Sequence, residues 1–100
     1  MRFLITARMF ESIYRQEDVL KGRESIGKGY GRIKESGKLV ESGVFGDQRG
    51  GFFLVDVNSA AEIHELLGPE FLDHFNIEAH PIAAWDDLGK FLDKLKREGR

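Results

Sequence analysis

The chain has 100 residues, a length that allows one domain around one hydrophobic core. With 41% hydrophobic and 32% charged residues, its composition is that of a soluble globular protein and excludes extensive disorder. The 17 acidic residues outnumber the 15 lysines and arginines, and the resulting net charge of -2 disfavours nucleic acid as a partner. Because the chain contains no cysteine, disulfides, thiolate metal sites and a cysteine nucleophile are excluded.

The N-terminal residues do not have the pattern of a targeting segment. Thr6 and Arg8 interrupt the apolar run that begins at Phe3, whereas a signal peptide needs a longer apolar stretch. No window approaches the roughly 18 consecutive apolar residues of a membrane span. We therefore expect a cytoplasmic protein that has no membrane partner.

The first half of the chain predicts a strand followed by a helix. Residues 2–9 alternate in the period of two that is typical of a strand. Over residues 17–37 apolar side chains recur at helical spacing. Four glycines interrupt this helix: Gly22, Gly27, Gly29 and Gly31. Each glycine costs a helix about 1 kcal/mol relative to alanine, so this helix is expected to be either irregular or packed very closely. Close packing of the helix on a sheet is the better interpretation.

The middle of the chain predicts a hairpin and a second helix. Residues 38–46 and 52–57 form two strands, joined by the turn-forming residues 47–51. Ser59 and Glu62 then have the spacing of a capping box, in which each side chain satisfies a free N–H at the start of a helix. This helix runs to Leu67 and ends at Gly68 and Pro69.

The last third predicts a fourth strand and an amphipathic helix. Residues 75–82 alternate, and residues 84–98 place five apolar side chains on one helical face: Trp85, Leu88, Phe91, Leu92 and Leu95. We expect this face to cover the edge of the sheet or a partner subunit. The order β-α-β-β-α-β predicts an α+β fold, a ferredoxin-like sandwich with a four-stranded antiparallel sheet and both main helices on one face. Residues 1–100 form this single domain, with helix 84–98 as a C-terminal appendage.

The alternation divides the strand residues between two faces of the predicted sheet. The helix-covered face carries Phe3, Ile5, Ala7, Phe53, Val55, Val57, Phe75, Ile77 and Ala79. The opposite face, which we call the open face, carries Leu4, Thr6, Arg8, Phe52, Leu54, Asp56, Asn76, Glu78 and His80. The open face is too apolar for solvent and too polar for a sealed core. We therefore expect a homodimer, or a higher homo-oligomer, that encloses a partly polar cavity between two open faces; the alternative is a monomer with an amphipathic outer face.

One segment of the sequence carries a family resemblance. Residues 51–64 place a strand ending in Asp56-Val57 before a serine-containing cap and a helix with the pair Ile63-His64, and residues 75–79 contain Ile77-Glu78. This pattern resembles the muconolactone delta-isomerase family over residues 51–82, and strand 2–9 fits it loosely.

A second, weaker resemblance is to the YCII-related family, through Gly43, Gly46 and the segment Gly68-Pro69-Glu70-Phe71. Both families belong to the dimeric α+β barrel superfamily. The resemblance therefore implies a homodimeric α+β barrel and, for the isomerase family, an enzyme that needs no cofactor. The superfamily also includes proteins without known activity.

Glu78 and His80 are the candidate catalytic residues. Side chains two residues apart on a strand emerge on the same face, here the open one. A carboxylate in a partly apolar pocket and an imidazole both suit proton abstraction and return beside a carbonyl. The alternative is structural: Glu78 pairs with Arg8 across neighbouring strands, and His80 caps the strand end.

Four further residues are candidates for substrate binding. Arg8 can anchor a substrate carboxylate, or it can instead pair with Asp56 or Glu78. Thr6 and Asp56 are candidate orienting groups. His64 matches the family pattern, although a histidine on a helix more often packs or forms a hydrogen bond. The spacing of the three histidines does not indicate a metal site, and we expect neither a metal nor a cofactor.

The sequence thus predicts a cofactor-independent enzyme that performs an isomerase-like proton transfer on a small acidic or carbonyl compound. The expected partner is a small-molecule ligand, such as a carboxylate, bound by a homodimer. The alternative is a non-enzymatic ligand-binding or oligomerisation module of the same fold.

Overall fold

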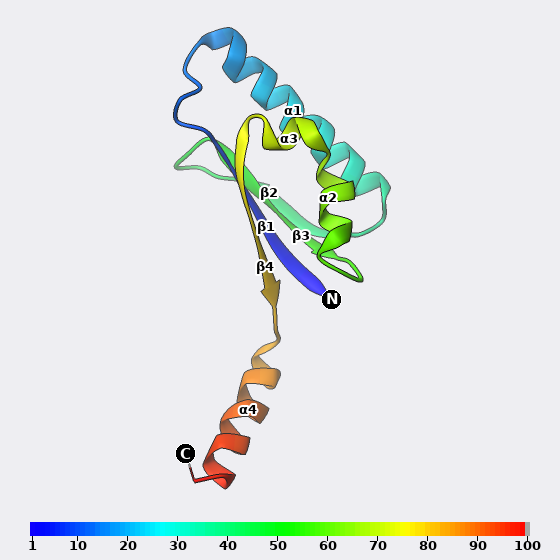
Figure 1. Cartoon of the computed structure of the whole chain (residues 1–100), viewed down its shortest axis with the longest axis vertical. Coiled ribbons are helices and arrows are strands. Elements are labelled where there is room, and N and C mark those ends of the chain that lie inside the picture. The colour runs from blue at the N-terminus through cyan, green and yellow to red at the C-terminus, as the bar shows by residue number, and fades with distance from the viewer. Residues whose placement is uncertain (100) are drawn as a thin grey trace.

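The computed structural model describes residues 1–99. In chain order its elements are β1 (Arg2–Met9), α1 (Gln16–Glu35), β2 (Leu39–Val44), β3 (Gly50–Asp56), α2 (Ala61–Leu67), α3 (Pro69–Leu72), β4 (Phe75–Ile82) and α4 (Trp85–Arg97). The four strands form one sheet in the order β2-β3-β1-β4, and all three neighbouring pairs are antiparallel. The helices α1, α2 and α3 cover one face of this sheet (Figure 1). This arrangement confirms the predicted α+β, ferredoxin-like fold.

The hydrophobic core lies between the sheet and these three helices. Seven of the nine side chains predicted to face the helices are buried: Phe3, Ile5, Ala7, Phe53, Val55, Val57 and Phe75. Ile77 is half-buried and packs against the core. The prediction for Ala79 is wrong, because Ala79 is exposed. β4 is an edge strand, and α3 covers only its beginning, so the residues further along β4 lie outside the helix layer (Figure 1).

Two of the four α1 glycines allow close packing, but only Gly22 packs against the sheet as predicted, whereas Gly29 packs against α3. A Cβ atom on Gly29 would overlap the ring of Phe71, and one on Gly22 would lie 2.6 Å from the Met9 methyl carbon. At Gly27 and Gly31 an added Cβ would meet open space. Close packing therefore explains Gly22 and Gly29 but not the other two glycines.

The start of α2 differs from the predicted capping box. The helix begins at Ala61, and no side chain caps its first residue. The Glu62 carboxylate instead accepts hydrogen bonds from the backbone N–H of Asn58 at 3.3 Å and from the Lys38 Nζ at 2.8 Å. The hydrogen bond from Asn58 still closes the turn before the helix.

The short helix α3 was not predicted from the sequence. Gly68 has φ 77°, a left-handed conformation that ends α2 and redirects the chain, and Pro69 opens the next turn. Phe71 on α3 is fully buried. Its ring lies 6.0 Å from that of Phe53 and 5.3 Å from that of Phe75. Phe71 therefore anchors the segment after Gly68 to the core, while Pro69 and Leu72 remain exposed.

The helix α4 stands clear of the sheet and extends the molecule to 58 Å along its longest axis (Figure 1). None of its described residues is buried, and Trp85 is 85% exposed. The expectation that α4 covers the sheet edge of its own chain is therefore wrong. Within residues 1–99, no helix has the length and apolar character needed to cross a membrane.

Candidate functional site

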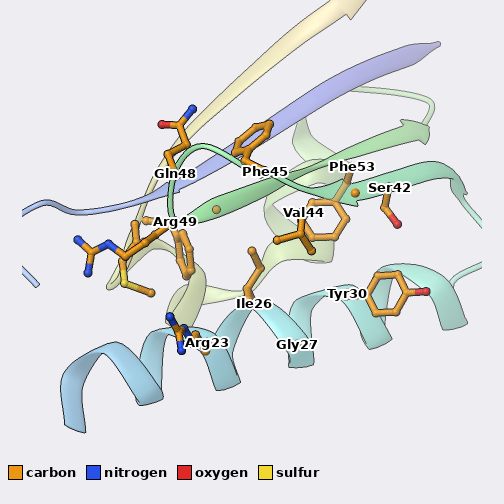
Figure 2. A pocket seen from close by; sticks show the side chains of 14 residues that line it. Arg23, Ile26, Gly27, Tyr30, Ser42, Val44, Phe45, Gln48, Arg49 and Phe53 are labelled. Atoms are coloured by element: carbon orange, nitrogen blue, oxygen red, sulfur yellow. The ribbon is translucent and has the colours of Figure 1, made fainter. Parts of the chain in front are cut away.

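A cavity of about 590 Å³ lies between α1 and the β2–β3 hairpin, on the helix-covered side of the sheet (Figure 2). We call it the helix-side cavity. Its walls are mostly apolar and include side chains from α1, from both hairpin strands and from the neighbouring strand ends: Met9, Ile26, Val44, Phe45, Phe53 and Phe75. Gly27 leaves one part of the α1 wall without a side chain. The Tyr30 ring stacks beside Phe53, with 6.5 Å between the ring centroids.

Few polar side chains line the helix-side cavity. Arg23 and Tyr30 project from α1, Ser42 lies on β2, and Gln48 and Arg49 belong to the hairpin loop (Figure 2). The Arg49 guanidinium is already engaged, because it donates hydrogen bonds to the carbonyls of residues 10 and 13 at 3.0 and 2.6 Å. Arg23, by contrast, forms no ion pair with any carboxylate side chain that the structure describes. Arg23 is therefore available to a ligand anion.

The alternation of the strand residues predicted a cavity on the open face, whereas this apolar cavity lies on the other side of the sheet. Tyr30 had the spacing of a core residue, but its side chain reaches the cavity and is 40% exposed. One sequence signal was available: Ser42 interrupts the apolar side of β2 opposite Phe53. A small polar residue at that point indicates that α1 does not pack tightly on β2.

Glu78 and His80 meet on the open face. The Glu78 Oε2 lies 3.1 Å from the His80 Nε2, and both side chains are about half exposed. Thr6 is the cross-strand neighbour of Glu78, and Leu4 is the neighbour of His80. The structure thus brings the two candidate catalytic groups into hydrogen-bonding contact beside Thr6.

Arg8 does not pair with Glu78, so that structural alternative is wrong. In the register of β1 and β4, Arg8 lies opposite Asn76, and Glu78 bonds His80 instead. Arg8 lines a second, more polar hollow of about 690 Å³ together with Asn76 and Glu11. This hollow shares Gln48 and Arg49 with the helix-side cavity. Arg8 therefore lies where an anion could bind, but two residues further along β1 than Thr6, the cross-strand neighbour of Glu78.

Asp56 and His64 lie away from the Glu78–His80 pair. The Asp56 carboxylate accepts two hydrogen bonds from Arg2, at 3.0 and 3.2 Å, near the opposite end of β1. The hydrogen bonds from Arg2 hold the pKa of Asp56 below its usual range, and the same contact raises the pKa of Arg2. His64 is exposed on α2, in the helix layer. No group of three or more potential metal ligands gathers among the side chains that the structure describes.

The comparisons with known proteins identify a fold and no family. No protein-family model matches the chain, and no curated protein matches it significantly in sequence. Among solved structures, the chain is similar to 5-chloro-2-hydroxyhydroquinone dehydrochlorinase from Burkholderia phenoliruptrix AC1100, in complex with 2,5-dihydroxybenzoquinone. The TM-score is 0.63, the sequence identity is 15%, and the match covers 87% of this chain and 98% of the dehydrochlorinase chain. This likeness independently supports the ferredoxin-like α+β fold.

Proposed function

We propose that the protein is a cofactor-independent enzyme and that its helix-side cavity binds a small, largely apolar compound carrying an acidic or carbonyl oxygen. The observation that carries this proposal is the cavity itself. Its volume of about 590 Å³ lies in the range of small-molecule sites, which typically measure about 300–1,000 Å³. Apolar walls with a few polar side chains are also typical of such sites.

The polar residues suggest how such a compound would be held. Arg23 and Tyr30 are seven residues apart on α1, which places them on the same helical face about 10 Å apart along the axis. The Arg23 guanidinium suits an anionic group, and the hydroxyls of Tyr30 and Ser42 suit a second oxygen. A compound of about one ring fits between these groups.

The structural neighbour supports this ligand class. Its structure contains 2,5-dihydroxybenzoquinone, a single ring that bears hydroxyl and carbonyl oxygens. The resemblance of residues 51–82 to the muconolactone delta-isomerase family supports an isomerase-like proton transfer. None of the described cavity residues is a carboxylate or a histidine, so the Tyr30 hydroxyl is the group proposed to exchange the proton with a ligand in this cavity.

The cavity is tested by ligand binding, with 2,5-dihydroxybenzoquinone and benzoate as probes in titration calorimetry. Ser42→Leu fills the cavity from β2, and we expect at least a tenfold weaker Kd. Arg23→Ala removes a charged hydrogen bond worth about 1.5–3 kcal/mol, which corresponds to a roughly 10- to 100-fold loss. The matched control is Glu41→Leu, which adds the same side chain on the neighbouring β2 residue that faces the open side. Equal affinity of the Ser42 and Glu41 variants would contradict the proposal.

A second candidate site for the same chemistry is the Glu78–His80 pair on the open face, with Thr6 and Arg8 as binding groups. The 3.1 Å contact between carboxylate and imidazole favours it. The half-buried Leu4, Phe52 and Leu54 lie in the same part of the face. This site would need the cover of a second copy of the chain, as in the predicted homodimer.

Proton exchange distinguishes the two candidates. The ring hydrogens of 2,5-dihydroxybenzoquinone exchange with deuterium from D2O when a general acid–base group acts on them, and the loss of the proton NMR signal measures the rate. General acid–base groups contribute about 10²- to 10⁴-fold in rate. If the helix-side cavity is the catalytic site, Tyr30→Phe lowers the catalysed rate by that order, whereas Glu78→Gln leaves it unchanged. The reverse pattern assigns catalysis to Glu78 and His80.

A further inference from the structure

The helix α4 carries an apolar stripe that its own chain leaves uncovered. The stripe consists of Trp85, Leu88, Phe91, Leu92 and Leu95, and the first four are exposed by 43–85%. In Figure 1, α4 extends away from the sheet and from the other helices. A helix with one wide apolar face and an otherwise charged surface needs a partner surface to bury that face.

The mouth of the helix-side cavity is an uncovered surface of matching chemistry. Val44, at the end of edge strand β2, is 87% exposed, and Tyr30 across the mouth is 40% exposed. The charges at this mouth are positive: Arg23 lines it, and the Lys34 Nζ lies 5.8 Å from the centre of the Tyr30 ring. The first turn of α4 is negative, with Asp86 and Asp87 next to Trp85. The apolar stripe, with the acidic Asp87 at its edge, thus complements an apolar mouth flanked by bases.

The first turn of α4 cannot reach the cavity of its own chain. The mouth lies at β2, across the sheet from β4, and three strand spacings separate these edges by about 14 Å. The register of the sheet places Val44 at the same level along the strands as Ile77, through the paired residues Gly51 and Ala7. Ile77 is five residues, or about 16 Å, before Ile82. The two displacements combine to about 22 Å, whereas the three residues from Ile82 to Trp85 span at most about 10 Å. Trp85 can therefore occupy such a mouth only on another chain.

We infer that α4 of one copy of this chain lies across the mouth of the helix-side cavity of a second copy. Trp85 contacts the apolar wall at Val44 and Tyr30, and Asp87, which borders the stripe one turn before Phe91, faces Arg23 and Lys34. In a symmetric exchange each copy contributes Trp85 and Phe91. At about 150–250 Å² for each ring, the four rings bury roughly 600–1,000 Å², and the leucines of both helices bring the contact into the range of stable interfaces.

This docking makes the cavity a site built from two chains, because Trp85 of one copy closes the cavity of the other. Its consequence for a ligand rests on the proposed function, whereas the docking itself does not depend on any ligand. The tests therefore use protein alone, and their failure is distinct from a failure of ligand binding.

Trp85 is the chain's only tryptophan, so its fluorescence reports on the docking directly. We expect the emission to shift to shorter wavelength as protein concentration rises, because the indole moves from water to an apolar contact. Arg23→Glu places a negative charge opposite Asp87 and shifts the transition to at least tenfold higher concentration. The matched control Lys28→Glu changes the same charge at an exposed α1 position outside the cavity lining and leaves the transition in place. Emission of an exposed indole at every concentration would overturn the inference, and so would an Arg23→Glu protein whose emission matches that of the wild type throughout.

Cysteine cross-linking identifies the contact, and the absence of native cysteines makes it specific. Leu88→Cys chains are mixed with Val44→Cys chains that carry a size tag and are then oxidised. We expect a mixed disulfide dimer, and a yield at least several-fold lower when Lys90→Cys, on the polar face of α4, replaces Leu88→Cys. If Leu88→Cys chains link mainly to each other, α4 pairs with α4 and the inference fails. It fails equally if Lys90→Cys links to Val44→Cys as well as Leu88→Cys does.

Discussion

Glu62 shows how one carboxylate can join three segments of the chain. Its Oε2 accepts hydrogen bonds from the Lys38 Nζ before β2 and from the backbone of Asn58 before α2. Two hydrogen bonds hold the pKa of Glu62 below its ordinary value. The bond from Lys38 has the larger effect, and the bond from Asn58 the smaller one. The spacing Ser59-x-x-Glu62 correctly indicated a carboxylate that reaches back from the helix. It could not reveal Lys38, because that contact depends on how β2 lies beside α2.

The lowered pKa of Glu62 predicts a specific loss of stability in acid. A group whose pKa is lower in the folded than in the unfolded protein stabilises the fold above its unfolded pKa, and this contribution disappears as the pH falls through its folded pKa. Glu62→Gln should therefore be less stable than the wild type at pH 7, and the difference should close as the pH drops from about 5 toward 2. Urea denaturation at several pH values measures this. The exposed Glu65→Gln serves as control, and a Glu62→Gln deficit that persists unchanged at low pH would contradict the assignment.

At the scale of elements, the fit of α1 against α3 determines how close the helix layer lies to the sheet. Gly29 on α1 leaves room for the Phe71 ring from α3, and that ring contacts Phe53 and Phe75 in the sheet. The glycines of α1 therefore have different roles. Gly29 admits a ring, whereas Gly27 lies at the helix-side cavity, where an added Cβ would meet nothing within 4 Å.

Alanine substitutions at two α1 glycines separate packing from helix propensity. Gly29→Ala adds a methyl group where the Phe71 ring lies, and we expect a loss of roughly 1–3 kcal/mol in the free energy of unfolding. Gly31→Ala meets open space and should raise stability by up to about 1 kcal/mol, through helix propensity alone. Urea midpoints of the two variants give the comparison. A Gly29→Ala protein as stable as Gly31→Ala would show that α1 and α3 are not in close contact.

The elements differ in how well the sequence could predict them. β4 was predicted with its observed bounds, and α1 to within two residues, because alternation and helical spacing are properties of neighbouring residues. α3 has four residues, too few to show a period, and its existence depends on Phe71 finding space beside Gly29. Such a fit between distant segments leaves no trace in a local pattern.

At the scale of the whole molecule, the sheet separates the two candidate sites. The helix-side cavity lies on one face with Arg23 and Tyr30, and the Glu78–His80 pair lies on the other. The alternation of strand residues identified the two faces, and it placed Glu78 and His80 correctly on the same side. It could not locate the cavity, because a cavity exists where α1 and β2 fail to fill the space between them. That is a property of the assembled layers.

The most direct test of the account is a titration of uniformly ¹⁵N-labelled protein with 2,5-dihydroxybenzoquinone, followed by amide chemical shifts. If the ligand occupies the helix-side cavity, the largest changes should fall on Gly27, Tyr30 and Ser42, and the shifts should saturate with one Kd. The amides of Thr6, Glu78 and His80 should change little, because the sheet lies between them and the ligand. Saturable changes centred on Glu78 and His80 instead, with Gly27 and Ser42 unaffected, would contradict the account and place the ligand on the open face.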